Sequence, residues 1–160
     1  MIVVSDASPL ISLAATGQLN LLRHLYAEVV IPVAVHREIT VSPDASGAVA
    51  LKAAAWIRVQ AVQNHTLVEA LSLSVDPGEA EAIALAVETE AELLLMDERR
   101  GRGAATRMGR RVVGVLGVLI EAKQHGHLST VRPVLDSLIE KVGFRVSDVL
   151  KERVLAAAGE

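Results

Sequence analysis

Short apolar runs recur along the chain and alternate with longer segments in which apolar residues have helical spacing. The runs are rich in Val, Ile and Leu and lie at 2–4, 29–31, 57–59, 93–96 and 112–115. Runs of this length and composition are typical of strands that are buried on both faces. Because parallel neighbours need crossover connections, the alternation predicts a three-layer α/β/α fold with a parallel, roughly five-stranded sheet.

Helix start signals lie between these runs. They are Ser8-Pro9, Pro32, Asp44 and Asp76-Pro77. A capping residue or a first-turn proline favours a helix start, so we expect a helix after each signal. Helical patterns also fill the segments 116–126, 130–143 and 147–160. We therefore predict a single domain over 1–160, with a core over about 2–127 and a helical extension over about 128–160.

The composition also predicts the cellular compartment of the protein. The chain has 160 residues, of which 51% are hydrophobic, and this is ample for one core. It has no Cys, which rules out a disulfide framework or a thiolate metal site and favours a reducing compartment. No basic segment precedes the first apolar residues, and the longest apolar stretch, 112–120, is too short to span a bilayer. We expect a soluble, cytoplasmic protein.

Two of the apolar runs end in an aspartate. Asp6 follows the first run closely, and Asp97 follows the run at 93–96. If the two strands are neighbours where the strand order of the sheet reverses, both carboxylates face one crevice, where a cation or a shared proton must relieve their repulsion. The alternative for Asp6 is a helix N-cap, but Ser8-Pro9 already supplies a cap and a first-turn proline.

Four other acids call for different explanations. Asp76 and Glu79 have the spacing of a capping box, which gives both a structural role. Glu81 lies among apolar neighbours, where an unpaired carboxylate is costly, unless it occupies the one wet edge of its helix. Glu38 also lies among apolar positions, with a solvated helix residue as the alternative.

Asp6, Glu38, Glu81 and Asp97 together offer only oxygen ligands. No thiolate or histidine cluster accompanies them, which suits Mg²⁺ or Mn²⁺ and disfavours zinc. Such an ion can lower the pKa of a bound water and neutralise the charge that develops on a phosphodiester. These four acids therefore indicate nuclease chemistry.

The motifs around these acids resemble, in order and spacing, the PIN-domain proteins, specifically a prokaryotic branch related to VapC-type toxin ribonucleases. They are VVSDASPLISLAATGQLNLL, VHREI, DPGEAEAIALA, LLLMDERRGR and GVLGVLIEAKQHG, within roughly 2–127. The resemblance implies a Mg²⁺- or Mn²⁺-dependent endonuclease, a hydrolase, that cuts single-stranded RNA. It implies catalytic roles for Asp6, Glu38, Glu81 and Asp97, metal ligation by Asp6, Glu81 and Asp97, and supporting roles for Ser8 and Glu79.

Two positions depart from the family's pattern. The third acid is usually Asp and is here Glu81, with Glu79 as a rival, and ERRGR follows Asp97 where many relatives have a shorter turn. One alternative function is a catalytically silent PIN-like module that binds nucleic acid or protein. A phosphoryl-accepting receiver domain is disfavoured, because no carboxylate follows the third apolar run and no Lys follows the fifth.

Arginines are concentrated beside Asp97. The net charge is −3, yet six of the twelve arginines lie between 99 and 111. Guanidinium groups position phosphates, so Arg99, Arg100 and Arg102 are candidate substrate-binding residues, with a solvated basic helix as the alternative. The chain has only one Trp, one Tyr and one Phe, too few for a base-stacking platform, so we expect contacts to the RNA backbone.

Self-association is predicted from two apolar segments. The segment 10–26 and the pattern of Val149, Leu150, Val154 and Leu155 offer more apolar surface than one small sheet needs. We predict a homodimer, and the resemblance adds a small antitoxin as a second candidate partner. Light scattering at micromolar concentration should give twice the chain mass of 16.9 kDa, and a monomer mass would contradict this prediction.

Overall fold

A five-stranded parallel sheet forms the centre of the protein. The structure is a computed structural model that describes residues 1–41 and 45–160, with only the backbone of residues 45 and 46. The strands are β1 (Val3–Ser5), β2 (Val29–Ile31), β3 (Ile57–Val59), β4 (Leu93–Leu95) and β5 (Val112–Val113). They lie in the order β3-β2-β1-β4-β5. The predicted three-layer α/β/α fold with a parallel sheet is confirmed.

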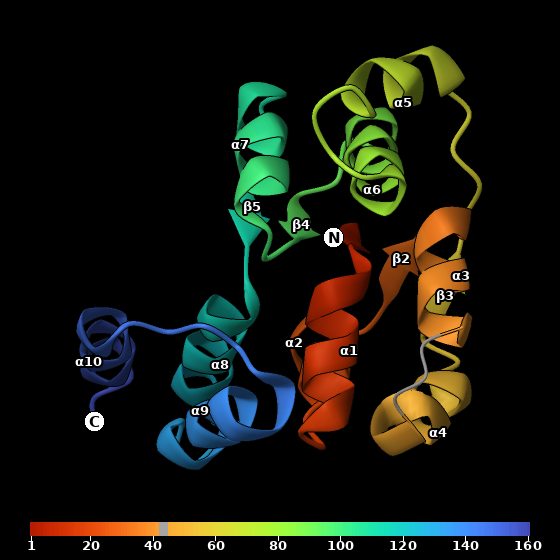
Figure 1. Cartoon of the computed structure of the whole chain (residues 1–160). Coiled ribbons are helices and arrows are strands. Elements are labelled where there is room, and N and C mark those ends of the chain that lie inside the picture. Colours follow the sequence, from red (N-terminus) through yellow and green to blue (C-terminus); the bar gives the residue numbers. More distant parts are fainter. Residues whose placement is uncertain (42–44) are drawn as a thin grey trace.

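Helices flank the sheet (Figure 1). They are α1 (Ala7–Ala15), α2 (Asn20–Tyr26), α3 (Val33–Val41), α4 (Ala45–Ala53), α5 (His65–Leu71), α6 (Pro77–Glu88), α7 (Arg99–Arg107), α8 (Val115–Gln124), α9 (Arg132–Ser137), the π-helix η1 (Leu138–Val142) and α10 (Asp148–Ala157). No helix in the described part of the chain is long and apolar enough to cross a membrane.

Two of the four predicted helix starts match the structure. Those at Pro32 and Asp76-Pro77 are confirmed, while Asp44 lies outside the described residues. The start predicted at Ser8-Pro9 is wrong, because α1 already begins at Ala7. Asp6 occupies the N-cap position with an extended backbone, but its side chain makes no capping hydrogen bond. The carboxylate of Asp6 therefore does not cap α1.

The sheet is buried most deeply at its centre. All residues of β1, β2 and β4 are buried, whereas the edge strands β3 and β5 are partly exposed. The chain accordingly enters the centre of the sheet within its first residues, because β1 is the middle strand (Figure 1). The last strand is shorter than predicted, because Gly114 is the N-cap of α8 and Val115 is already helical.

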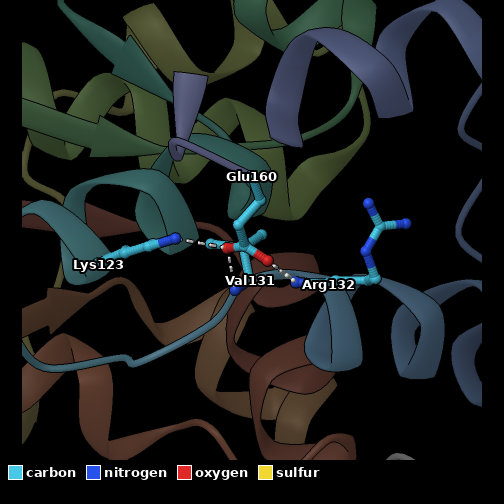
Figure 2. A network of polar contacts seen from close by, with 4 residues as sticks. All are labelled: Lys123, Val131, Arg132 and Glu160. Atoms are coloured by element: carbon cyan, nitrogen blue, oxygen red, sulfur yellow. Dashed lines mark hydrogen bonds and ion pairs between the residues drawn. The ribbon is translucent and has the colours of Figure 1, made fainter. Parts of the chain in front are cut away.

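The C-terminal helices are tied to α8 by one carboxylate. Glu160 accepts hydrogen bonds from the backbone amides of Val131, at 2.6 Å, and Arg132, at 3.2 Å, and from Nζ of Lys123, at 2.9 Å (Figure 2). These donors hold the pKa of Glu160 down at about 2. The network joins the chain end beyond α10 to the start of α9 and to α8.

Most of the apolar side chains from which the homodimer was predicted are buried within the protein. Leu10, Leu13 and Leu22 are fully buried, and Val154 and Leu155 are buried in α10. Val149 and Leu150 are exposed to 60% and 40%, and Ile11 and Leu25 are only partly buried, so these four side chains keep the accessible apolar surface that the prediction used. The homodimer stays a prediction that now rests on a smaller surface.

Close contact between α1 and α4 yields a prediction of stability. A Cβ at Gly47 would lie 2.7 Å from Cβ of Ala14 and 3.1 Å from its backbone carbonyl carbon. Gly47→Ala must push the helices apart, so we expect the free energy of unfolding in urea to fall by about 1–2 kcal/mol.

Gly103→Ala is the matched control in an open helical position. The atom nearest to its new Cβ would be Nη1 of Arg107, at 3.5 Å. Higher helix propensity should raise the free energy of unfolding by up to about 1 kcal/mol. If Gly47→Ala were as stable as Gly103→Ala, the close packing of α1 on α4 would be refuted.

Candidate active site

The candidate site lies where β1 and β4 end. Ser5 pairs with Leu95, and the backbone amide of Asp6 donates to the carbonyl oxygen of Leu95 at 2.9 Å. Asp6 and Asp97 therefore leave neighbouring strands at the same edge of the sheet. The chain builds outward from β1 toward β3 and then returns to place β4 on the other side of β1. Ligand crevices form at such a reversal of strand order.

A cavity of about 700 Å³ opens at this edge. We call it the acidic cavity, because six carboxylates line it. They are Asp6, Glu38, Asp76, Glu79, Asp97 and Glu98. The remaining lining comes from Ser8, Arg102, Leu116, Gly117, Phe144, Arg145 and Leu150. The two arginines leave a clear excess of negative charge.

Asp6 and Glu79 are the most deeply buried of these acids, each only 5% exposed. Burial, helped by the charges of Glu79, Glu38 and Asp76, raises the pKa of Asp6 to about 7, although a hydrogen bond from the backbone amide of Ala7 lowers it. Burial and the charge of Asp76 likewise raise the pKa of Glu79 to about 7. Near neutral pH these carboxylates need either protons or a cation.

Asp97 is held at the start of α8. Its Oδ1 accepts a hydrogen bond from the amide of Val115 at 2.8 Å, whereas its buried Oδ2 has no hydrogen-bond partner among the described residues. Burial raises the pKa of Asp97, against the lowering effects of Val115 and the charge of Arg102. A buried acceptor without a donor is rare, and a bound cation would explain this one.

Two glycines make room for the carboxylates. A Cβ at Gly78 would overlap Oε1 of Glu38, and a Cβ at Gly114 would lie 2.6 Å from Oδ1 of Asp97. These glycines stand at the starts of α6 and α8. Helix N-termini carry partial positive charge, so the glycines let acids approach groups that favour them.

The structure brings most of the predicted site residues to one cavity. Asp6, Ser8, Glu38, Glu79, Asp97 and Arg102 line it. Glu81 does not: its Oε1 accepts a hydrogen bond from the amide of Ala34 at 3.2 Å, in the first turn of α3. Residues two apart on a helix point about 200° apart, so Glu79 and Glu81 cannot both face the cavity. The structure thus places Glu79, the rival position, in the cavity and Glu81 outside it, and the ligand and catalytic role of Glu81 stays a prediction.

The other two predicted arginines lie beyond the acidic cavity. Arg99 and Arg100 line a neighbouring cavity of about 420 Å³ together with Arg107. A third cavity, bounded by Arg100, Asp76, Glu79 and Glu98, lies between the two. The third cavity shares lining residues with each of the other two, so the three form a row with the arginines at its far end.

Several residues that line the cavity were not predicted from the sequence to belong to the site. Asp76 and Glu98 cap α6 and α7, which was the role predicted for Asp76, and they also add charge to the cavity. Phe144, Arg145 and Leu150 come from the C-terminal segment. The local pattern holds no signal for them, because only the packing of α9, η1 and α10 brings them to the sheet.

The chemistry of the donors suits a divalent cation. Within residues 1–41 and 45–160, no three Asp, Glu or His side chains already lie in an arrangement that could hold one ion. The available donors are nevertheless all carboxylate oxygens, which Mg²⁺ and Mn²⁺ prefer. The unpartnered Oδ2 of Asp97 and the raised pKa values of Asp6 and Glu79 also fit a cation held by these three residues.

Comparison with known proteins identifies the family. A family model described as a PIN domain matches residues 2–160, and no curated protein matches the chain. The chain therefore belongs to the PIN-domain family. The match reaches through α10, well beyond the segment whose motifs carry the resemblance. PIN domains are generally nucleases and typically use divalent metals.

The raised pKa values predict how stability depends on pH. The unfolded chain loses the proton of Asp6 near 3.8, whereas the folded protein keeps it up to about 7. Stability from this group is thus fully present below 3.8 and is lost as the pH rises to about 7. In metal-free buffer, Asp6→Asn should flatten this fall in the free energy of unfolding.

Urea unfolding across this pH range, in EDTA, measures the effect. Glu79→Gln should flatten the profile in the same way, and Glu152→Gln, on the exposed face of α10, should leave it unchanged. An Asp6→Asn profile that runs parallel to that of the wild type would show that Asp6 does not titrate as described.

Proposed function

We propose that the protein is a PIN-type endonuclease that cuts single-stranded RNA with the help of Mg²⁺ or Mn²⁺. One observation carries the proposal: the buried Asp6 and Glu79 and the half-buried Asp97 line one cavity, and a buried oxygen of Asp97 has no hydrogen-bond partner among the described residues. A buried cluster of like charges is costly unless a cation is bound. PIN domains typically use divalent metals, so a bound cation fits a nuclease of this family.

The residues that line the cavity would have different roles in hydrolysis. Asp6, Glu79 and Asp97 would hold the ion, which supplies a water of lowered pKa and neutralises charge on the phosphodiester. Glu38 is accessible from the cavity, and its partial burial and the charge of Asp76 raise its pKa, so its carboxylate can accept a proton from the attacking water. The hydroxyl of Ser8 is exposed and can donate to a phosphate oxygen.

Arginines would position the RNA backbone. Arg102 lines the acidic cavity and is anchored by a 3.0 Å hydrogen bond from Nη1 to the carbonyl oxygen of Met96. The row of cavities then leads to Arg99, Arg100 and Arg107. An extended polyanion can follow such a path from the acids to the arginines, which favours a single strand over a duplex.

The alternative function is a catalytically silent PIN-like module that binds nucleic acid or protein. It is favoured by the finding that no three carboxylates in the described ranges are already arranged around one ion. A role as the toxin of a toxin–antitoxin pair, with a small antitoxin as partner, extends the main proposal and rests on the sequence resemblance, whereas the homodimer rests on the exposed apolar side chains of Val149 and Leu150.

Substitution of the acids tests the proposed function. Asp97→Asn and Glu79→Gln should lower the rate of single-stranded RNA cleavage in Mn²⁺ by about 100-fold or more. Glu81→Gln is the matched control, because Glu81 points to α3, and it should cleave at nearly the wild-type rate. In EDTA, Asp97→Asn should melt at the same temperature as the wild type or higher, because burial disfavours the charged carboxylate.

Thermal melting with and without Mn²⁺ completes the test. The ion should raise the melting temperature of the wild type and of Glu81→Gln, with a smaller effect on Asp97→Asn. An Asp97→Asn protein that cleaves as fast as the wild type, or a wild type that Mn²⁺ leaves unstabilised, would refute the proposal.

A further inference from the structure

The C-terminal segment supplies one wall of the acidic cavity, and none of the side chains in this wall is acidic. Phe144, Arg145 and Leu150 come from the turn after η1 and the first turn of α10. They combine an aromatic ring, a guanidinium group and an aliphatic side chain. We call these three residues the C-terminal wall. An aromatic face beside a cation matches the two parts of a nucleotide, its base and its phosphate.

The C-terminal wall is held in place by local structure. Gly143 ends η1 in the left-handed region, at φ 75°, and the amide of Phe144 then donates to the carbonyl oxygen of Leu138 at 3.0 Å. Ser147 caps α10 by accepting a hydrogen bond from the amide of Leu150 at 3.1 Å. The ring of Phe144 is half-buried against the core. The ring therefore needs little ordering when a ligand binds.

Arg145 is the more available of the two cations that line the cavity. Arg102 already donates to Met96 and lies beside Asp97. Arg145 is exposed, and its side chain forms no hydrogen bond or ion pair with any residue that the structure describes. An unpaired arginine beside six carboxylates is positioned to bind an anion that enters the cavity.

We propose that the C-terminal wall binds one nucleotide of the single-stranded RNA next to the scissile phosphate. The base lies against Phe144 and Leu150, and the phosphate of that nucleotide pairs with Arg145. This inference rests on the proposed nuclease function and adds a positioning site to it. The cavity, about 700 Å³, has the size of a small-ligand pocket. Because every base has a π-face, the contact tolerates all four bases.

The test combines protein variants with abasic RNA. Phe144→Leu removes the ring but keeps an apolar side chain, Phe144→Tyr keeps the ring, and Arg145→Gln removes the charge. Arg153→Gln is the control, an exposed arginine of α10 outside the cavity lining. The probes are a short single-stranded RNA and a series in which each nucleotide in turn lacks its base. Fluorescence anisotropy in Ca²⁺ gives Kd, and cleavage in Mn²⁺ gives KM and kcat.

Phe144→Leu should weaken binding of intact RNA by about tenfold and raise KM more than it lowers kcat. One abasic position should cause the same loss in the wild type, and removal of that base should have no further effect in Phe144→Leu. Phe144→Tyr should bind like the wild type. Arg145→Gln should weaken binding of every RNA and reduce the salt dependence by about one phosphate contact. Melting temperatures and their shifts with Mn²⁺ should not change.

Each contrary outcome has a distinct meaning. If the wild type cleaves RNA but Phe144→Leu and Arg145→Gln bind it as Arg153→Gln does, the inference is overturned and the nuclease function stands. The same holds if the wild type binds every abasic RNA as tightly as the intact one, which excludes a base contact even where Phe144→Leu unfolds. A wild type that neither binds nor cleaves single-stranded RNA overturns both.

Discussion

The parallel pairing of β1 with β4 brings the two strand-end aspartates together. Ser5 lies opposite Leu95, so both strands deliver their next residues to the same edge of the sheet. Asp6 and Asp97 then lie in a crevice that α6, α8 and the C-terminal segment close. A different neighbour for β1 would separate the carboxylates and leave no acidic cavity. The candidate site is therefore a direct consequence of strand order.

The same pairing creates an electrostatic problem that the surrounding helices solve in part. Asp76 and Glu98 accept hydrogen bonds from the starts of α6 and α7, and Asp97 accepts one from the start of α8. Backbone dipoles and amides thus offset some of the negative charge. Asp6 and Glu79 remain disfavoured as anions, as their raised pKa values show. This residual cost is what a divalent cation would relieve.

The sequence was most informative where local pattern and function coincide. The buried strands and the two strand-end aspartates follow from apolar runs and their order, and a parallel sheet leaves few ways to arrange them. The sequence favoured Glu81 over Glu79, whereas the structure places Glu79 in the cavity, because a helical pattern does not tell which face of α6 meets the sheet. The predicted capping role of Asp76 is confirmed, but nothing in the local pattern indicated that Asp76 also lines the acidic cavity. Phe144 and Arg145 reach the cavity only through tertiary packing.

A calorimetric titration with Mn²⁺ at about pH 6 and about pH 8 tests the central claim that the buried acids hold a cation. Since Asp6 and Glu79 titrate near pH 7, metal binding must displace protons at the lower pH. We expect measurable binding at both pH values, tighter at the higher one, with proton release at the lower one and weaker binding by Asp6→Asn. A titration without binding heat, or an affinity that pH and Asp6→Asn leave unchanged, would contradict the account.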